Sequence, residues 1–247
     1  MKPFFARLGG KTRLCKKIVE MIPDHKVYVE PFIGAGSVFL RKRRSIVEVI
    51  NDLDKDIYDM WNDLLKLKRS DLDKMDMKAD REKFLEMREH PEKYSGSVYE
   101  RFYRNIYLSK NSFSQNRRTY GTYLEKHPVN INYLKETIGD FQNRLNGVSI
   151  KNKDYKEVVL EFDGPDTFFY LDPPYSNAEK GWNYVSSIQP NELLDVLRKI
   201  KGKFIMSYDD CETNRELFKE FKISVVPLVY RFHKNKKTTT ELLIQNY

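Results

Sequence analysis

The run Thr167-Phe168-Phe169-Tyr170-Leu171-Asp172-Pro173-Pro174-Tyr175 indicates which type of fold to expect. Its first five residues are β-branched, aromatic or aliphatic, which predicts a strand buried on both faces of a parallel sheet. Two prolines then end the strand, because neither can donate to a sheet ladder. We therefore expect the Asp172 carboxylate at the carboxyl end of a central strand, where open α/β sheets bind their ligands.

The two prolines also stiffen this corner. Each fixes its own φ, so the Asp172 carboxylate and the Pro173 carbonyl should project in one direction. Two adjacent acceptors suit an NH2 group, and they bind a nitrogen more strongly as positive charge develops on it. The Tyr175 ring would form a wall for a flat heterocycle. The alternative is a capped strand end followed by a turn. With proline at about 5% of residues, chance gives Asp-Pro-Pro-Tyr in roughly one chain of this size per thousand, which favours the functional interpretation.

Composition predicts one large domain, or one domain with an insertion, in a chain of 247 residues. The net charge of +8 favours a polyanionic partner, nucleic acid before an anionic membrane. Two cysteines and four histidines without ligand spacing predict neither a disulfide framework nor a metal site. No signal peptide or apolar span is visible, so we expect a soluble, cytoplasmic protein that is not secreted.

Two glycine motifs precede predicted helices. The first motif, Gly9-Gly10-Lys11-Thr12, stands at the start of a predicted helix. Backbone N–H groups and the Lys11 ammonium could bind a carboxylate or phosphate there, and a plain loop is the alternative. The second follows a predicted strand at 27–29 and leads into an expected helix through Val38–Leu40. Its Gly34 and Gly36 permit close approach of a nucleotide-like ligand. The basic run 41–44 is expected to be a solvated turn at the end of that helix.

Two further strand ends carry carboxylates. Asp52 follows a predicted strand at 46–50 and lies 22 positions after Glu30, where a ribose-binding acid belongs in this architecture; capping of a helix from Asp56 is the alternative. Asp154 follows a predicted strand at 148–150. It could accept from an adenine amino group while Tyr155 covers the ring, or it could simply form a turn.

Between residues 56 and 147 the α/β alternation gives way to helical spacing. We interpret this part as an inserted helical lobe with an aromatic and basic loop, since Arg reads base edges and Lys and Arg neutralise phosphates. The residues expected to contact DNA are Lys110, Asn111, Arg117, Arg118 and Tyr120.

Taken together, these motifs resemble the Dam-type, D12-class N6-adenine DNA methyltransferases that depend on S-adenosylmethionine. The resemblance covers nearly the whole chain in the family's order, including the Gly-Gly-Lys, Glu-Pro-Phe-Ile-Gly-Ala-Gly and Asp-Pro-Pro-Tyr segments and the closing run 241–247. It implies an α/β fold: a seven-stranded, mostly parallel sheet of the Rossmann-like methyltransferase type, with the last strand antiparallel. Residues 1–55 and 148–247 would form the catalytic domain, and residues 56–147 a helical target-recognition lobe.

The resemblance also implies the site. Asp172 and Pro173 would hold the target amino group, Pro174 would stiffen the corner, and Tyr175 would stack on an extruded base. Lys11 would contact the methionine part of the cofactor, Asp52 its ribose, and Asp154 with Tyr155 its adenine. Other residues expected at the cofactor are Arg7, Gly10, Glu30, Phe32, Gly34, Gly36, Leu53 and Asp172.

Two segments depart from the family pattern. Arg7 stands where the family commonly has an aromatic residue, and the recognition loop 113–124 matches only loosely. The hypothesis is methyl transfer from S-adenosylmethionine to N6 of a flipped adenine in double-stranded DNA, without a metal or a membrane. Cytosine N4, RNA adenine or a protein amide is the alternative substrate, and a catalytically silent DNA-binding relative is the alternative of another class. The recognition sequence and oligomeric state are not predicted.

Overall fold

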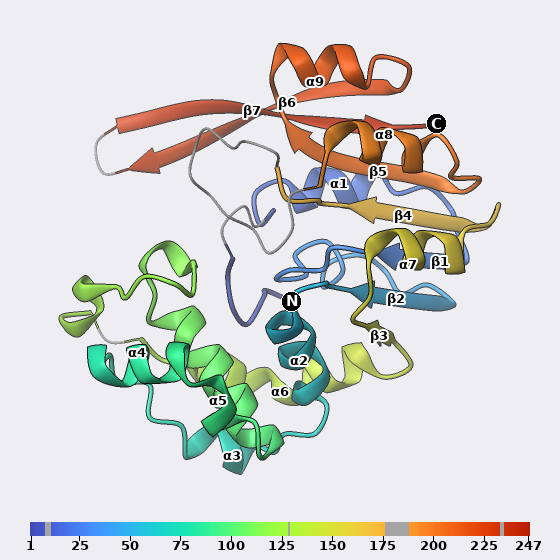
Figure 1. Cartoon of the computed structure of the whole chain (residues 1–247). Coiled ribbons are helices and arrows are strands. Elements are labelled where there is room, and N and C mark those ends of the chain that lie inside the picture. Colours follow the sequence, from blue (N-terminus) through green and yellow to red (C-terminus); the bar gives the residue numbers. More distant parts are fainter. Residues whose placement is uncertain (8–10, 128, 176–187, 233–234) are drawn as a thin grey trace. The chain divides into compact units, whose positions relative to one another are not determined.

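A seven-stranded sheet is the central element of the computed structural model (Figure 1). The model describes residues 1–7, 11–127, 129–175, 188–232 and 235–247, with the backbone alone described for 229–232 and 235–238. The strand order is β3-β2-β1-β4-β5-β7-β6. The strands are β1 (Val27–Glu30), β2 (Val47–Asn51), β3 (Ser149–Lys151), β4 (Thr167–Leu171), β5 (Lys203–Asp209), β6 (Lys222–Phe232) and β7 (Asn235–Gln245).

The direction of the strands confirms the predicted sheet. The strand β1 pairs in parallel with β2 and β4, and β4 pairs in parallel with β5. The last strand, β7, runs antiparallel to both β5 and β6. The predicted strand at 167–171 coincides with β4, and all five of its residues are buried. A strand without any polar alternation therefore occupies the middle of the sheet, as its composition requires.

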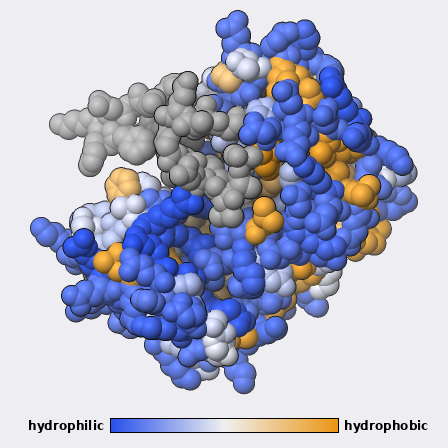
Figure 2. All heavy atoms as spheres, viewed as in Figure 1, coloured by the Kyte–Doolittle hydropathy of each residue, from blue (hydrophilic) through white to orange (hydrophobic). Residues whose placement is uncertain are grey.

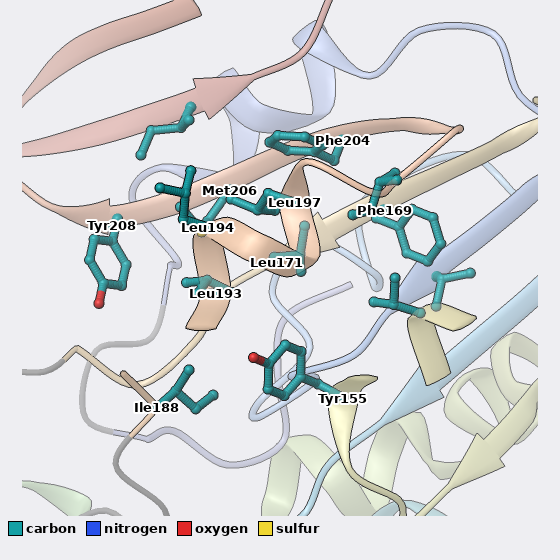
Figure 3. Close-up of a cluster of buried hydrophobic side chains, with 14 of the residues drawn as sticks. Tyr155, Phe169, Leu171, Ile188, Leu193, Leu194, Leu197, Phe204, Met206 and Tyr208 are labelled. Atoms are coloured by element: carbon teal, nitrogen blue, oxygen red, sulfur yellow. The ribbon is translucent and has the colours of Figure 1, made fainter. Parts of the chain in front are cut away.

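Helices cover both faces of the sheet. On one face lie α7 (Tyr155–Phe162), α8 (Pro190–Leu197) and α9 (Glu212–Leu217), and α1 (Cys15–Met21) lies behind the sheet in Figure 1. The cluster drawn in Figure 3 shows how α8 is held: Leu193, Leu194 and Leu197 pack against side chains of β4 and β5. Full burial of each such leucine contributes about 1.5–3 kcal/mol to folding.

The predicted helix through Val38–Leu40 is wrong, and these residues form turns. The amide of Leu40 bonds the Gly36 carbonyl, but the next amide, that of Arg41, bonds Val38 three residues back. Gly34 and Gly36 have φ values of +46° and +68°, which right-handed helices do not allow. The glycines thus permit a tight turn after β1, and the next helix in the chain is α2 (Lys55–Leu64), which follows β2.

The basic run 41–44 is not wholly solvated as expected, because Lys42 is buried. Its ammonium is bonded to the buried Glu48 carboxylate and lies 4.1 Å from the centre of the Tyr28 ring. It also donates to the Ser45 hydroxyl over 3.0 Å. A charge inside a protein needs such a partner, and the partner here is a strand residue that faces inward.

The chain divides into two compact units. The sheet unit comprises Thr12–Ile33, Lys42–Leu53 and Lys151–Tyr247, and the helical unit comprises Met1–Lys11, Gly34–Arg41 and Asp54–Ile150. The helical unit contains α2, α3 (Arg69–Asp73), α4 (Arg81–Glu89), η1 (Pro91–Tyr94), α5 (Val98–Lys110), η2 (Phe113–Gln115), η3 (Thr122–Glu125) and α6 (Asn132–Leu145).

Aromatic side chains form the core of the helical unit. The Phe4 ring lies 5.2 Å from both Trp61 on α2 and Phe141 on α6, with near-perpendicular planes. Phe102 on α5 is stacked at 6.1 Å from Phe4. The N-terminal segment therefore belongs to the helical unit by its packing.

The surface seen in Figure 2 is mostly hydrophilic and carries separate apolar patches. Ile46 and Leu160 are the most exposed large apolar side chains of the described residues, at 81% and 84%. Within the described ranges, no helix is sufficiently long and apolar to span a membrane.

Candidate active site

Polar side chains of the sheet unit follow the carboxyl ends of three parallel strands. Glu30 ends β1, Asp52 follows β2, and Asp172 follows β4. The registers of β1 with β2 and β4 bring these ends to one edge of the sheet. Parallel sheets bind ligands at this edge, so it is the candidate site.

The Asp172 corner is built from the end of β4. Pro173 is buried, while Asp172 is half-buried at the start of the corner. The hydroxyl of Ser207 on β5 donates to the Asp172 carboxylate over 3.1 Å, and the Tyr170 hydroxyl lies 3.0 Å from that of Ser207. The prediction placed a carboxylate at this point but missed Ser207, since nothing in a strand pattern pairs it with a residue 35 positions away.

Tyr175 is anchored by side chains of two further strands. Its hydroxyl donates to the buried Glu241 carboxylate on β7, and its ring meets Tyr208 of β5 edge-on at 5.4 Å. Burial, and then the charges of Asp172 and Glu241, raise the pKa of Tyr175 well above its ordinary value. The phenol therefore stays neutral and can donate to Glu241.

Asn51 joins the ends of β1 and β2. It belongs to the Asn51-Asp52-Leu53 segment of the family resemblance, which assigns it no role. Its amide donates to the carbonyls of Pro31 and Lys153 over 2.9 and 3.0 Å, and its side-chain oxygen accepts from the Lys153 amide. Its own carbonyl accepts from Ile33. Glu30 is also fixed, because the Tyr28 hydroxyl donates to it over 2.6 Å. The backbone around the candidate cofactor residues is thus tied together by buried polar groups.

Asp52 and Leu53 lie in a loop held by the Asn152 amide, which donates to both of their carbonyls. The helix α2 is capped by Asp54, whose carboxylate accepts from the Asp56 amide over 3.1 Å. Capping of this helix by Asp52, the alternative to ribose binding, is therefore wrong. Leu53 is exposed at 42%.

Phe32 and Tyr155 form an aromatic pair with their ring centres 5.1 Å apart. Tyr155 is buried, and burial is the main reason why its pKa is raised. Among the described residues its hydroxyl has no hydrogen-bond partner. Asp154 caps α7 by accepting from the Lys156 amide over 2.9 Å. Asp154 therefore forms a local backbone contact, as the turn alternative implies. Its contact with the adenine of the cofactor stays a prediction.

Five predicted cofactor residues belong to the helical unit or lie outside the described residues: Arg7, Gly10, Lys11, Gly34 and Gly36. Lys11 is buried, and Arg7 pairs with Asp54 over 3.3 Å. The Gly34 carbonyl accepts from the Trp61 indole over 2.9 Å. Gly10 lies outside the described residues, as do its neighbour Gly9 and residues 176–187. The sequence predicts a polar loop over 176–188 and offers it as a candidate lid.

The residues predicted to bind DNA differ in their exposure. Arg118 is exposed, whereas Asn111 and Tyr120 are buried and burial lowers the pKa of the half-buried Lys110. The Tyr120 ring packs 5.5 Å from Phe84, and burial raises its pKa to about 12. The sequence also predicts a phosphate contact for Arg231, Lys234, Lys236 and Lys237, and the side chains of these residues lie outside those described.

Arg117 is held within the helical unit. Its guanidinium bonds the Asp56 carboxylate over 2.5 Å and the Asn105 side chain over 3.1 Å, and it lies 3.8 Å from Asp54. Its φ is +61°, and Ser114 and Gln115 in the same loop also have positive φ. Non-glycine residues adopt this conformation only where the surroundings impose it.

Comparison with known proteins identifies the family of the chain. The sequence model of one protein family, the D12 class N6 adenine-specific DNA methyltransferases, matches residues 8–232. The DNA adenine methylase of Escherichia coli K12 is 30% identical over 273 residues, covering 98% of this chain and 94% of its own length. The type II methyltransferase M.MjaIII of Methanocaldococcus jannaschii is 25% identical over 296 residues, covering 100% and 99%. A putative RNA methyltransferase structure from Pyrococcus horikoshii covers 99% of this chain and 88% of its own at 9% identity, with a TM-score of 0.46.

The family match spans most of the chain, and the predicted resemblance is confirmed. The activity is methylation of adenine in DNA with S-adenosylmethionine as methyl donor, and the chain belongs to the D12 class of N6 adenine-specific DNA methyltransferases.

Proposed function

We propose that the enzyme methylates N6 of an adenine extruded from duplex DNA, and that Asp172 and the Pro173 carbonyl hold its amino group. The observation that carries the proposal is a half-buried carboxylate at the end of β4, oriented by a hydroxyl 3.1 Å away. An adenine inside a duplex is stacked and paired, so a group fixed on a sheet edge reaches it only after extrusion.

The corner would act by stabilising charge. The N6 lone pair is delocalised into the ring, and two acceptors on its hydrogens favour the tetrahedral, reactive geometry. When bound, S-adenosylmethionine supplies a methyl group on a positively charged sulfur. As the nitrogen–carbon bond forms and the carbon–sulfur bond breaks, positive charge moves onto the nitrogen beside the Asp172 carboxylate. Asp172 would then accept the proton that the nitrogen loses.

The sheet unit offers groups that fit the cofactor. Asp52 can accept hydrogen bonds from both ribose hydroxyls, and Phe32 with Tyr155 provides apolar ring surface for its adenine. The buried Tyr155 hydroxyl, which lacks a partner in the described part of the chain, suits a polar ligand atom. By the family resemblance, we also assign Glu30, Lys11, Gly34 and Gly36 to cofactor binding.

Asp52→Ala should weaken the binding of S-adenosylmethionine by about 10- to 100-fold, because two hydrogen bonds to a charged acceptor are lost. Affinity for DNA should stay within about twofold. Calorimetric titration of the cofactor and fluorescence anisotropy with a labelled duplex measure the two quantities. Asp195→Ala, which removes an exposed carboxylate on α8, is the matched control. Equal affinities of Asp52→Ala and the control for the cofactor would contradict ribose binding.

Tyr175→Ala should lower kcat/KM for DNA by about 10- to 100-fold, because base–aromatic stacking contributes about 1–3 kcal/mol per base. The readout specific to extrusion is the fluorescence of 2-aminopurine at the target position, which rises as the base leaves the stack. The variant should show a smaller rise than the unchanged enzyme, at unchanged cofactor affinity. A full fluorescence rise with unchanged kcat/KM would show that Tyr175 does not hold the base.

Contacts with the DNA backbone are proposed for Arg118, the exposed arginine of the loop that follows α5. The net charge of +8 supports attraction to the duplex. Arg117 has two carboxylates beside it, so we propose that it orders this loop. Since the substrate is DNA, the enzyme is expected to act in the cytoplasm or in another DNA-containing compartment.

One experiment tests the proposed function directly. DNA from cells that lack other methyltransferases and express this chain is sequenced with modified-base detection, and part of it is digested to nucleosides. We expect N6-methyladenine at one recurring sequence on duplex DNA. N4-methylcytosine instead, or no modified base, would overturn the proposal.

A further inference from the structure

Ser207 is a fully buried polar residue next to the proposed catalytic carboxylate. It lies on β5, where Leu171 of β4 is in register with Met206, so Ser207 stands beside Asp172. Phe204, Met206 and Tyr208 on the same strand pack toward the helices α7–α9. The alternation of a strand therefore turns Ser207 to the other face.

The hydrogen bonds around Ser207 have a defined direction. An ionised carboxylate only accepts, so the single Ser207 proton points to Asp172, at an oxygen–oxygen distance of 3.1 Å. The Ser207 oxygen then accepts the proton of the Tyr170 hydroxyl, which lies 3.0 Å away. The buried hydroxyls of Tyr170 and Ser207 thus form a hydrogen-bonded chain that ends on one oxygen of the half-buried Asp172 carboxylate. Consecutive bonds of this kind strengthen one another.

We propose that Ser207 is a positioning residue for methyl transfer, supported by the Tyr170 hydroxyl. Its hydrogen bond to Oδ1 restrains the rotation of the Asp172 carboxylate, the group proposed to hold the target amino group. The inference rests on the proposed role of Asp172. A carboxylate on a strand end can otherwise rotate about two torsions, and catalysis by fixed dipoles requires that it does not.

The test is a kinetic double-mutant cycle of Ser207→Ala and Tyr170→Phe. Single-turnover methylation of a saturating duplex should fall about 10- to 100-fold in Ser207→Ala and less in Tyr170→Phe, since hydrogen bonds to charged groups contribute more than neutral ones. KM for DNA and the affinity for S-adenosylmethionine should stay within about twofold. Tyr170→Phe should have no further effect in the Ser207→Ala background, because the chain is already broken.

The control is Thr167→Val at the other end of β4, which removes a buried hydroxyl that donates to the Phe162 carbonyl over 2.7 Å. It should lower the melting temperature about as much as Ser207→Ala while leaving the rate unchanged. The positioning role would be overturned if Tyr170→Phe lowered the methylation rate equally in the unchanged enzyme and in Ser207→Ala. An unchanged rate in Ser207→Ala alone would also overturn it. Asp172→Asn separates this outcome from failure of the proposed function, because an active Asp172→Asn would refute the role of Asp172 itself.

Discussion

Asp172→Ala should lower the rate of methyl transfer about a thousandfold or more while DNA binding largely survives, and Asp172→Asn should behave similarly. The carboxylate is the charged acceptor of the corner, and its stabilising effect is largest when the nitrogen becomes positive. Alanine removes this acceptor, and asparagine replaces one oxygen by a group that donates toward the amino hydrogens. Because the interaction strengthens toward the transition state, kcat should fall and KM should change little.

Single-turnover incorporation of a labelled methyl group measures this rate, and anisotropy with a labelled duplex measures binding. Asp166→Asn is the matched control, since Asp166 precedes the same strand at its other end and forms an exposed ion pair with Lys26 over 2.8 Å. The control should retain nearly full activity. Turnover of Asp172→Ala within tenfold of the control would contradict catalysis by this carboxylate.

The sheet and its corner could be predicted because their signals are local. The uninterrupted apolar run 167–171 and the two prolines after it determine both the strand and its end. The helices were visible for the same reason: Leu134, Ile138, Phe141 and Leu145 recur at helical spacing and are buried on α6. In these segments the spacing of apolar residues in sequence directly reflects which face is buried.

The supporting residues of the site could not be predicted, because their partners are distant in sequence. Ser207 and Glu241 reach the corner 35 and 66 positions from the residues that they bond. A serine or glutamate in a strand carries no sign of such a partner until the strand order is known. The same holds for Lys42, whose burial with Glu48 contradicts the expectation for a basic run.

Arg117 shows that residue type alone does not give the surroundings of a side chain. A loop rich in arginine next to aromatic residues is typical of DNA recognition, and this pattern gave Arg117 and Arg118 the same predicted role. The side chain of Arg117 is only 13% exposed and pairs with Asp56, which is 61 positions away. Composition identifies the loop, but only tertiary contacts distinguish its inward arginine from the exposed one.

Arg101→Met should lower the free energy of unfolding of the helical unit by about 3–5 kcal/mol at pH 7.5, because it leaves a buried carboxylate without its partner. The Asp63 side chain on α2 is fully buried and accepts two hydrogen bonds from the Arg101 guanidinium on α5, over 2.7 and 3.0 Å. By comparison, Arg69→Met removes an exposed pair with Asp73 and should cost at most about 1 kcal/mol.

The pH dependence follows from the Asp63 carboxyl. Burial raises its pKa, and Arg101 opposes this rise, so loss of Arg101 should raise the pKa further. A carboxyl with a raised pKa binds its proton more tightly in the folded state, so its contribution to stability is present at low pH and is lost as pH rises through the folded pKa. The loss of unfolding free energy caused by Arg101→Met should therefore become smaller as the pH is lowered from 7.5 to 5.5.

Urea unfolding followed by the fluorescence of Trp61, in a Trp182→Phe background, measures this loss within the helical unit, where Trp61 is buried. The double variant Arg101→Met with Asp63→Leu is the decisive control, since replacing both members of a buried pair by apolar groups is often neutral. It should recover most of the lost stability and should show little pH dependence. If the double variant were as unstable as Arg101→Met, the deficit would come from lost packing of the arginine stem and not from the unpaired charge of Asp63.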